Sequence, residues 1–459
     1  MKLWDTIKTA MLKRPMQIIC EDNAEMTYEE IVVYSEIFSK KLSNERCCAI
    51  LCDSEMTAAI ALLGCFAAGV TAVPLSRKYG AAHCKKILKF ISPSAIITDW
   101  DGILKLTHIK DSEYEEPYKH PALIMCTSGT TGEPKGVMLT EENLLTNIRD
   151  ISSYLSISFK DYILISRPLY HSAVLTGEFL TSLFKGVKIR FYSDDFNPKI
   201  LTNMISEYEI TVFCGTPTIL SMLAKFNRNN ECDSLRVISI SGECMGFETG
   251  RRIRAAFPKA EIYHVYGLTE ASPRVSYLPS NLFETHPDSV GILLDSVMLS
   301  IVKPDGSFAK TGEDGVLWIK GKNIMTGYYK NPELTNKILK DGWLCTGDIV
   351  NVDYDGLIRI KGRIDDLIIR AGMNIYPQEV ENALKTDPRV KDVLVYKIND
   401  PKRGVQIGLK LSGEFTDTDE VKILCYDVLP LYQVPTMIEL LDELPKNITG
   451  KIIRRNVND

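Results

Sequence analysis

The chain has 459 residues, of which 45% are apolar and 25% charged; these are the proportions of a folded globular protein and exclude extensive disorder. This length is too great for one hydrophobic core, so we expect two or three structural units. The net charge of −5 and the pI near 5.9 leave no electrostatic footprint for nucleic acid or an anionic membrane. The expected partner is a small molecule.

The N-terminal segment interrupts its apolar residues with charges every few positions, which is not the pattern of a signal peptide. The twelve cysteines are scattered and form no C-x-x-C motif, which indicates reduced thiols and predicts a cytoplasmic protein. Residues 56–74 are apolar enough to be mistaken for a membrane span. However, Gly69 and the β-branched residues after it predict a buried helix followed by a short strand that stops at Pro74, so no membrane span is expected.

From about residue 18 to 265, short β-rich runs alternate with helix-length segments, which is typical of parallel sheets with crossover helices. The runs are 47–52, 94–99, 187–192, 210–215 and 235–241. From about residue 290 the apolar runs lie closer together and turn residues separate them, as in 296–321, which predicts a β-rich subdomain.

After the charged segment "GRIDD", the tail reads as strand, helix and strand, with Pro377 at the first helical position. The predicted fold is therefore α/β, in two domains. Residues 1–362 form a large N-terminal domain of α/β sheet subdomains plus the β-rich subdomain, and residues 363–459 form a small α+β domain.

The segment "CTSGTTGEPKG" (126–136) follows the apolar run "ALIMC", which reads as a strand leading into a loop. Its glycines free backbone N–H groups to turn inward, and its Thr, Ser and Lys residues add donors and one positive charge, which together suit a polyphosphate. A Walker A motif requires Ser or Thr after the lysine, whereas Gly136 follows Lys135 here. The loop is therefore not that of a P-loop NTPase.

More motifs follow in order along the chain. They are "SGE" (241–243), "YHVYGLTEAS" (263–272), "DGWLCTGDIV" (341–350), "KGRIDDLIIRAGMNIYPQEVE" (361–381) and "PKNITGKIIRR" (445–455). With the loop, they make nearly the whole chain resemble the adenylate-forming superfamily. This superfamily comprises acyl- and aryl-CoA synthetases, stand-alone adenylation proteins, the adenylation domains of peptide synthetases, and beetle luciferase.

The resemblance implies a set of nucleotide-binding residues. The loop residues Thr127, Ser128, Gly129, Thr130, Thr131, Gly132 and Lys135 would grip the phosphates, Gly242 and Glu243 would help form the adenine pocket, and Tyr266, with Gly267 after it, would lie against the base. Thr269 would touch phosphate, Glu270 would help place Mg²⁺ through ATP, and Asp348 and Arg363 would bind the ribose and the nucleotide.

The resemblance also implies that the small domain is mobile and rotates about a hinge at Asp365. Lys451 would be the catalytic lysine of acyl-adenylate formation, and Gly372 would lie beside the tunnel through which the thiol enters. The implied reaction uses ATP and Mg²⁺ to join a carboxylic acid to AMP with release of pyrophosphate. A second step would pass the acyl group to a thiol.

The segment "RPLYHSAVLTGEF" (167–179) resembles the family segment in which a His, here His171, lies at the mouth of the acyl pocket. Relatives that activate amino acids usually carry an Asp where this chain has Ser172, and no acid follows before Glu178. Because burying an unpaired ammonium group costs free energy, a carboxylic acid whose remaining part is uncharged is favoured over an α-amino acid.

The chain ends soon after Lys451 without a carrier-protein segment, so we expect the acceptor thiol to come from elsewhere. Coenzyme A is the simpler acceptor, and the phosphopantetheine of a separate acyl or peptidyl carrier protein is the alternative. A non-catalytic acyl-nucleotide sensor and a luciferase-like oxygenase share the same motifs and remain open. The oligomeric state is open as well.

Overall fold

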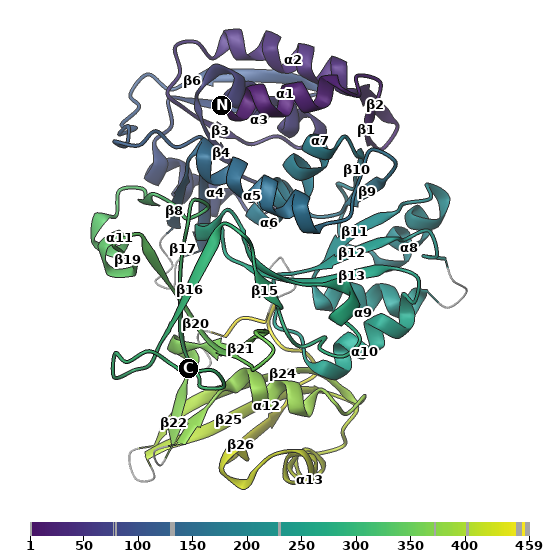
Figure 1. Cartoon of the computed structure of the whole chain (residues 1–459), viewed down its shortest axis with the longest axis vertical. Coiled ribbons are helices and arrows are strands. Elements are labelled where there is room, and N and C mark those ends of the chain that lie inside the picture. The colour runs from purple at the N-terminus through teal and green to yellow at the C-terminus, as the bar shows by residue number, and fades with distance from the viewer. Residues whose placement is uncertain are drawn as a thin grey trace.

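The computed structural model describes residues 2–76, 78, 80–128, 134–227, 231–370, 373–400, 404–446 and 452–454. In Figure 1 the N-terminal elements lie at the top, a large twisted sheet lies at the right, and the C-terminal unit lies below them. Among these residues, no helix is both long and apolar enough to cross a membrane. Residues 56–74 instead form a helix that ends at Gly69 with φ of +69°, followed by a strand, as the sequence predicts.

One sheet contains the strand that leads into the phosphate loop. Its strands run in the order β18-β8-β7-β4-β3-β5-β6, and β3, β4, β5 and β7 are parallel. The strands are β3 Cys47–Ile50, β4 Thr71–Pro74, β5 Ala95–Trp100, β6 Ile103–His108, β7 Leu123–Ser128, β8 Pro134–Leu139 and β18 Gly327–Tyr328. The helices of this part of the chain are α1 Leu3–Leu12, α2 Tyr28–Lys41, α3 Glu55–Ala68, α4 Ala81–Ile91 and α5 Glu141–Tyr154.

A second sheet runs in the order β15-β14-β13-β12-β11-β9-β10-β1-β2, and its central strands are parallel. The strands are β1 Ile18–Glu21, β2 Ala24–Thr27, β9 Tyr162–Ile165, β10 Lys188–Phe191, β11 Val212–Gly215, β12 Val237–Ile240, β13 Glu261–Gly267, β14 Arg274–Leu278 and β15 Ile292–Leu293. The helical elements between them are α6 Ser172–Val174, the π-helix η2 Leu175–Leu180, α7 Thr181–Lys185, α8 Pro198–Glu207, α9 Pro217–Phe226 and α10 Phe247–Ala256. Buried apolar strands such as β11 and β12 read as continuous hydrophobic runs because helices cover both faces.

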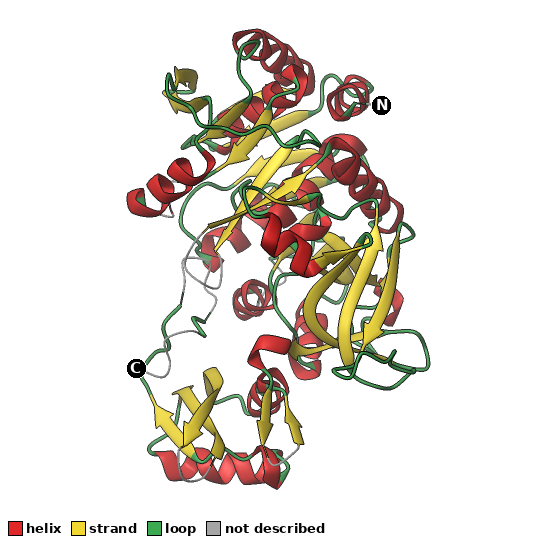
Figure 2. Ribbon diagram, turned by 90° about the vertical axis from the view of Figure 1, so that its left-hand side faces the viewer, coloured by secondary structure: helices red, strands yellow, loops and turns green. Residues whose placement is uncertain are grey.

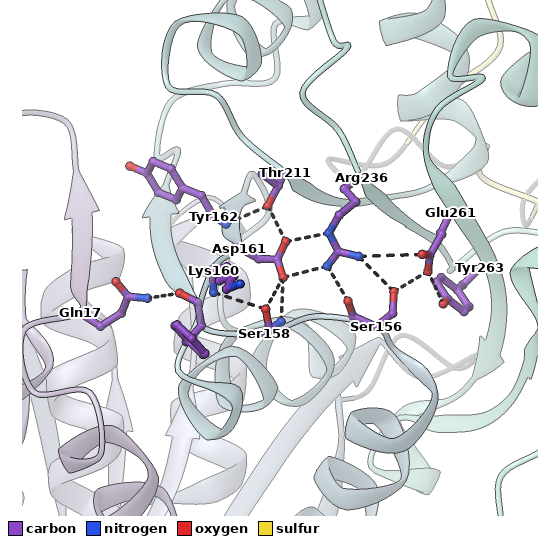
Figure 3. A network of polar contacts seen from close by, with 11 residues as sticks. Gln17, Ser156, Ser158, Lys160, Asp161, Tyr162, Thr211, Arg236, Glu261 and Tyr263 are labelled. Atoms are coloured by element: carbon purple, nitrogen blue, oxygen red, sulfur yellow. Dashed lines mark hydrogen bonds and ion pairs between the residues drawn. The ribbon is translucent and has the colours of Figure 1, made fainter.

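The amino ends of these parallel strands are tied together by a polar network, shown in Figure 3. Asp161 accepts hydrogen bonds from Arg236 Nε at 3.1 Å and from Thr211 Oγ1 at 2.9 Å. Burial raises the pKa of Asp161, but the bonds from Arg236 and Ser158 outweigh it and hold the pKa below its ordinary value. Because this network occupies the amino ends of the strands, we expect the candidate site at the opposite edge, at their carboxyl ends.

The β-rich unit that the sequence predicts is an antiparallel sheet in the order β16-β17-β20-β19, and β21 pairs with β20. Its elements are β16 Val297–Val302, β17 Gly315–Gly321, α11 Pro332–Ile338, β19 Leu339–Lys340, β20 Trp343–Val352 and β21 Ile358–Arg363.

The C-terminal unit has its own hydrophobic core, built from residues between Ile368 and Val434. Figure 2 shows it below the rest of the chain, with its helices and strands in a separate layer. Its elements are β22 Ile368–Arg370, β23 Met373–Ile375, α12 Pro377–Leu384, β24 Val390–Asp400, β25 Gly404–Gly413, α13 Thr418–Val428 and β26 Met437–Leu440. The predicted α/β class, the β-rich unit and the small C-terminal α+β unit are thus confirmed, whereas the boundary at residue 362 stays a prediction.

Candidate active site

The predicted phosphate loop joins two paired strands. β7 and β8 are antiparallel, and their register brings Thr127 opposite Lys135 and Ser128 opposite Pro134. The predicted loop residues Gly129, Thr130, Thr131 and Gly132 lie outside the described residues. The Lys135 ammonium lies 5.7 Å from the centroid of the Tyr328 ring, within the range of a cation–π contact.

Tyr328 connects the phosphate loop to the predicted magnesium residue. Its strand, β18, pairs with β8, and its hydroxyl donates a hydrogen bond to Glu270 Oε1 at 2.7 Å. Burial, and then the neighbouring Glu270 carboxylate, raise the pKa of Tyr328 far above its ordinary value, so Tyr328 stays a donor. Glu270 Oε1 is thereby oriented next to the loop. The sequence analysis missed Tyr328, although its segment "GYYKNPE" carries the paired aromatics that could have marked it.

The predicted ribose and nucleotide residues converge on Asp348. The Tyr266 hydroxyl donates to Asp348 Oδ2 at 2.5 Å, and Arg363 Nη1 donates to Asp348 Oδ1 and to the Thr346 carbonyl oxygen, both at 3.0 Å. Asp348 and Arg363 are also register partners on β20 and β21. Residues 82 positions apart, Tyr266 and Asp348, thus meet where β13 reaches the β-rich unit.

A glycine at position 347 makes room for this arrangement. Its φ is +75°, and a Cβ there would lie 2.9 Å from Arg363 Nη2. A larger residue would meet both a left-handed backbone and the guanidinium that binds Asp348.

The turn after β13 carries Thr269 and Glu270 in the short 3-10 helix η3, Thr269–Ala271. Gly267 permits the turn because a Cβ there would lie only 1.8 Å from the Pro273 carbonyl oxygen. Thr269 Oγ1 lies 3.0 Å from Ser172 Oγ. The predicted phosphate residue and the segment after His171 are therefore in direct contact.

His171 immediately precedes α6, and its ring centroid lies 4.2 Å from that of Tyr170. Burial, and then the positive charge of Arg167, lower the pKa of His171 to about 3. The imidazole is therefore neutral near pH 7 and can position a substrate, but it cannot supply a positive charge.

Gly242 and Glu243 follow β12 at the same carboxyl edge. Gly242 has φ of +91°. Glu243 Oε2 accepts a hydrogen bond from Thr218 Oγ1 at 2.6 Å and from the Thr218 backbone N–H at 3.3 Å. Its carboxylate therefore fixes the first turn of α9, a structural contact that the sequence did not indicate.

Of the residues predicted in the C-terminal unit, Asp365 lies in the 3-10 helix η5, Ile364–Asp366, directly after β21. Gly372 and Lys451 lie outside the described residues. Near Lys451 in sequence, Ile452 forms a β-bridge with Lys446, and Arg454 Nη2 donates to Glu381 Oε2 of α12 at 2.5 Å. Burial lowers the pKa of Arg454, but the Glu381 carboxylate, and then Asp366 and Cys244, outweigh it and hold the pKa above its ordinary value.

The chain matches the family described as AMP-binding enzyme over residues 8–329, and the AMP-binding enzyme C-terminal domain over residues 379–451. It is 32% identical over 352 residues to a long-chain-fatty-acid–CoA ligase of Haemophilus influenzae, which covers 74% of this chain and 61% of the ligase. It is 30% identical over 423 residues to a feruloyl-CoA synthase of an Amycolatopsis species, which covers 86% of this chain and 85% of the synthase.

Among solved structures, o-succinylbenzoate CoA synthetase from Bacillus subtilis, in complex with the acyl-adenylate intermediate OSB-AMP, superposes with a TM-score of 0.87 at 26% identity. That match covers 100% of this chain and 98% of the synthetase. The same enzyme in complex with ATP and magnesium ion matches with a TM-score of 0.86.

Proposed function

Because the chain belongs to the AMP-binding enzyme family, we propose that it is an AMP-forming acid–thiol ligase. It would activate a carboxylic acid with ATP to an acyl-AMP, release pyrophosphate, and pass the acyl group to the thiol of coenzyme A. The observation that carries the proposal is the convergence of Tyr266 and Arg363 on Asp348. This arrangement offers a carboxylate for two sugar hydroxyls, an aromatic ring for a base and a cation for the nucleotide.

In the first step, an oxygen of the substrate carboxylate would attack the α-phosphorus of ATP, and the bond from that phosphorus to the bridging oxygen would break. Pyrophosphate leaves with the bonding electrons. Lys135 lies at the base of the loop, where its ammonium group could bind the departing β- and γ-phosphates.

Glu270 fits the role of a magnesium ligand. Its Oε1 is oriented by Tyr328, and its carboxylate lies on the same turn as Thr269. A magnesium ion at a nucleotide is held by one or two carboxylates plus phosphate oxygens, so one acidic residue here suffices. When bound, the ion would offset negative charge on the phosphates.

Lys451 would stabilise the charge that accumulates around the α-phosphorus. The neutral His171 would fix the acyl group at the pocket mouth. In the second step the acyl carbon would be attacked by the thiolate of the acceptor, the C–S bond would form, and AMP would leave.

Coenzyme A is the acceptor that the relatives favour, because the names of the long-chain-fatty-acid and feruloyl relatives and of the o-succinylbenzoate enzyme all specify CoA. The chain spans 61% of the length of the long-chain ligase and 85% of the feruloyl-CoA synthase. Loading of a separate carrier protein remains the second candidate, with the same acyl-AMP intermediate.

The test is pyrophosphate release from ATP across a panel of fatty, aryl, dicarboxylic and amino acids, followed by mass analysis of the products with CoA or with a carrier protein that bears phosphopantetheine. We expect pyrophosphate with at least one acid and a thioester of that acid with CoA. A thioester formed only on the carrier protein would show that the carrier protein, and not CoA, is the acceptor, and would leave the proposed first step unchanged. No pyrophosphate with any acid would overturn the proposal and favour a nucleotide sensor.

A further inference from the structure

An ionic cluster that the proposed chemistry does not use lies at the point where the order of the parallel sheet reverses. From β9 the chain passes to β10 on one side and then to β11 on the other. In open α/β sheets, ligands bind in the crevice at the carboxyl ends of the strands at such a reversal. Arg167 follows the carboxyl end of β9, and Cys214 lies near the carboxyl end of β11, so both lie at this edge of the sheet.

The cluster is built around a buried carboxyl group. Arg167 Nη2 donates to Glu178 Oε1 at 2.6 Å; the Glu178 side chain is 0% exposed and that of Arg167 is 15% exposed. The buried Arg274 packs against the same helix, because a Cβ on Gly177 would lie 3.0 Å from Arg274 Nη2. Two guanidinium groups therefore surround one carboxyl group, and burial raises the pKa of that carboxyl. The cluster carries a surplus of positive charge.

The local backbone presents Glu178 to this cluster. Residues Leu175–Leu180 form a π-helix between α6 and α7. Such an insertion into an α-helix is rare and occurs most often at functional sites, because the extra residue shifts a side chain inward.

The cluster also borders the acyl side of the candidate site. Burial and then the charge of Arg167 lower the pKa of His171. Burial, and then the Glu178 carboxylate, raise the pKa of the Cys214 thiol, and the charges of Arg274 and Arg167 lower it. Arg167 therefore lies close enough to both His171 and Cys214 to act on each of them.

A purely structural ion cluster is expected to satisfy its own polar atoms. Here Glu178 Oε2, Arg167 Nε and Arg274 Nε are buried and have no hydrogen-bond partner among the described residues. The other terminal nitrogen of Arg167, Nη1, forms no hydrogen bond within that same part of the chain, and Arg167 is the member of the cluster that keeps some exposure. A ligand at the carboxyl ends of these strands would contact Nη1, which forms the open edge of the Arg167 guanidinium.

We propose that Arg167 is a specificity-determining residue that binds an anionic group at the far end of the acyl substrate, so that the preferred acid is a dicarboxylic acid. The inference rests on the proposed function and narrows its substrate class. A second carboxylate would pair with the open guanidinium edge, whereas a plain alkyl chain would desolvate that charge without compensation. An ammonium group would be repelled by Arg167 and Arg274. Glu178 is a positioning residue, which orients Arg167 and does not touch the substrate.

The experiment compares a series of α,ω-dicarboxylic acids with the monocarboxylic acids of the same length, by pyrophosphate release. We expect the wild-type protein to prefer a diacid. Arg167→Met should lower kcat/KM for that diacid by about 10- to 100-fold, the scale of one charged hydrogen bond, with little change for the matched monoacid and in the KM for ATP. Arg167→Lys should recover part of the loss, and Glu178→Gln should raise the KM for the diacid more than it lowers kcat.

The matched control is Arg236→Met, which removes another ion pair, between the 40% exposed Arg236 and the buried Asp161, from the opposite end of the same sheet. It should lower the melting temperature without altering the preference for diacids. An equal loss for diacid and monoacid in Arg167→Met, or a wild-type preference for monoacids, would overturn the proposal.

A second readout separates this inference from the proposed function. The diacid should raise the melting temperature of the wild-type protein more than the monoacid does, and Arg167→Met or, if that variant does not fold, Arg167→Lys should reduce the difference. A diacid-specific shift without pyrophosphate release would support Arg167 as a diacid site and overturn the ligase assignment. Pyrophosphate release without a preference for diacids and without a diacid-specific shift would support the ligase assignment and overturn Arg167 as a diacid site.

Discussion

At the scale of single residues, Glu55 is a partly buried acid that the proposed chemistry does not use. It lies at the start of α3 in a small cleft of about 80 Å³ that Leu75, Lys78 and Leu169 also line. Its Oε2 accepts a hydrogen bond from the Leu169 backbone N–H at 3.0 Å, two residues before His171. Burial raises the pKa of Glu55 to about 7; the Leu169 N–H and Lys78 lower it, and the Glu21 carboxylate adds to the rise.

We predict that Glu55→Gln stabilises the protein at alkaline pH. The folded protein holds the Glu55 proton up to about pH 7, whereas the unfolded chain releases it near its ordinary value of 4.5. The wild-type protein therefore loses stability from this group as the pH rises from about 4.5 to 7. Glutamine keeps an acceptor for Leu169 and carries no charge. Its gain in free energy of unfolding should reach about 2 kcal/mol at pH 8, after allowance for the partial exposure of the side chain.

Urea denaturation of both proteins at pH 5 and pH 8 measures this effect. The exposed Glu142→Gln, whose side chain is 66% exposed, serves as the control and should change stability equally little at both values. A Glu55→Gln variant whose stability relative to wild type does not change with pH would show that Glu55 is ionised and well solvated.

Single residues also mark what the sequence could and could not predict. Asp348, Tyr266 and Arg363 were found by motif, and the structure brings them together although no spacing rule joins them. Arg167 and Glu178 were missed as a pair because they stand 11 residues apart. Glu178 lies within the π-helix Leu175–Leu180, and no sequence period predicts that insertion.

At the scale of elements, the turn between β13 and β14 is the most constrained part of the site. The Leu268 backbone N–H donates to the Pro273 carbonyl oxygen at 2.9 Å, so that this oxygen cannot withdraw from Gly267 without breaking a bond. The turn carries both Thr269 and Glu270, so its geometry sets where phosphate and magnesium would be held.

We therefore predict that Gly267→Ala destabilises the protein by about 1–3 kcal/mol, the usual effect of overpacking, and raises the KM for ATP. Urea denaturation and the ATP dependence of pyrophosphate release measure the two effects. The control is Gly306→Ala, where the backbone is left-handed, unlike that of Gly267, but a Cβ would have open space. It should cost about 1–2 kcal/mol, from the left-handed backbone alone, and leave the KM for ATP unchanged. Equal behaviour of the two variants would remove the assigned role of the Gly267 turn.

The parallel strands were the most predictable elements, because each is a short apolar β-rich run between helix-length segments. The run 235–241 contains β12, and 210–215 contains β11. The pairing of β18 with β8 could not be predicted, because it joins residues almost 190 positions apart and β18 is only two residues long. That pairing brings Tyr328 to Glu270, which explains why the sequence analysis overlooked this contact.

At the scale of the whole molecule, the C-terminal unit contacts the rest of the chain at α12 and the residues beside it. A Cβ on Gly246 would lie 3.3 Å from the Asn382 side chain of α12, and Arg252 Nη2 donates to the Thr386 carbonyl oxygen at 3.3 Å. Lys361 pairs with Glu379 of the same helix at 2.8 Å. With Arg454 also bound to α12, this arrangement supports the hypothesis that the end of the chain serves the first step of the reaction.

The C-terminal unit has a hydrophobic core of its own, and Asp365 lies just before that core begins at Ile368. A rotation of this unit about Asp365 is therefore physically reasonable. Such a rotation would exchange the Lys451 segment for the Gly372 segment at the site. We propose that both half-reactions take place at one site, with the Lys451 segment serving the first and the Gly372 segment serving the second.

The most direct measurement compares the two half-reactions of Lys451→Ala. Pyrophosphate release with the preferred acid should fall by on the order of 100-fold or more, the scale of losing one preorganised charge stabiliser. Transfer to CoA from supplied acyl-AMP should retain most of its wild-type rate. An equal loss in both half-reactions would contradict the account.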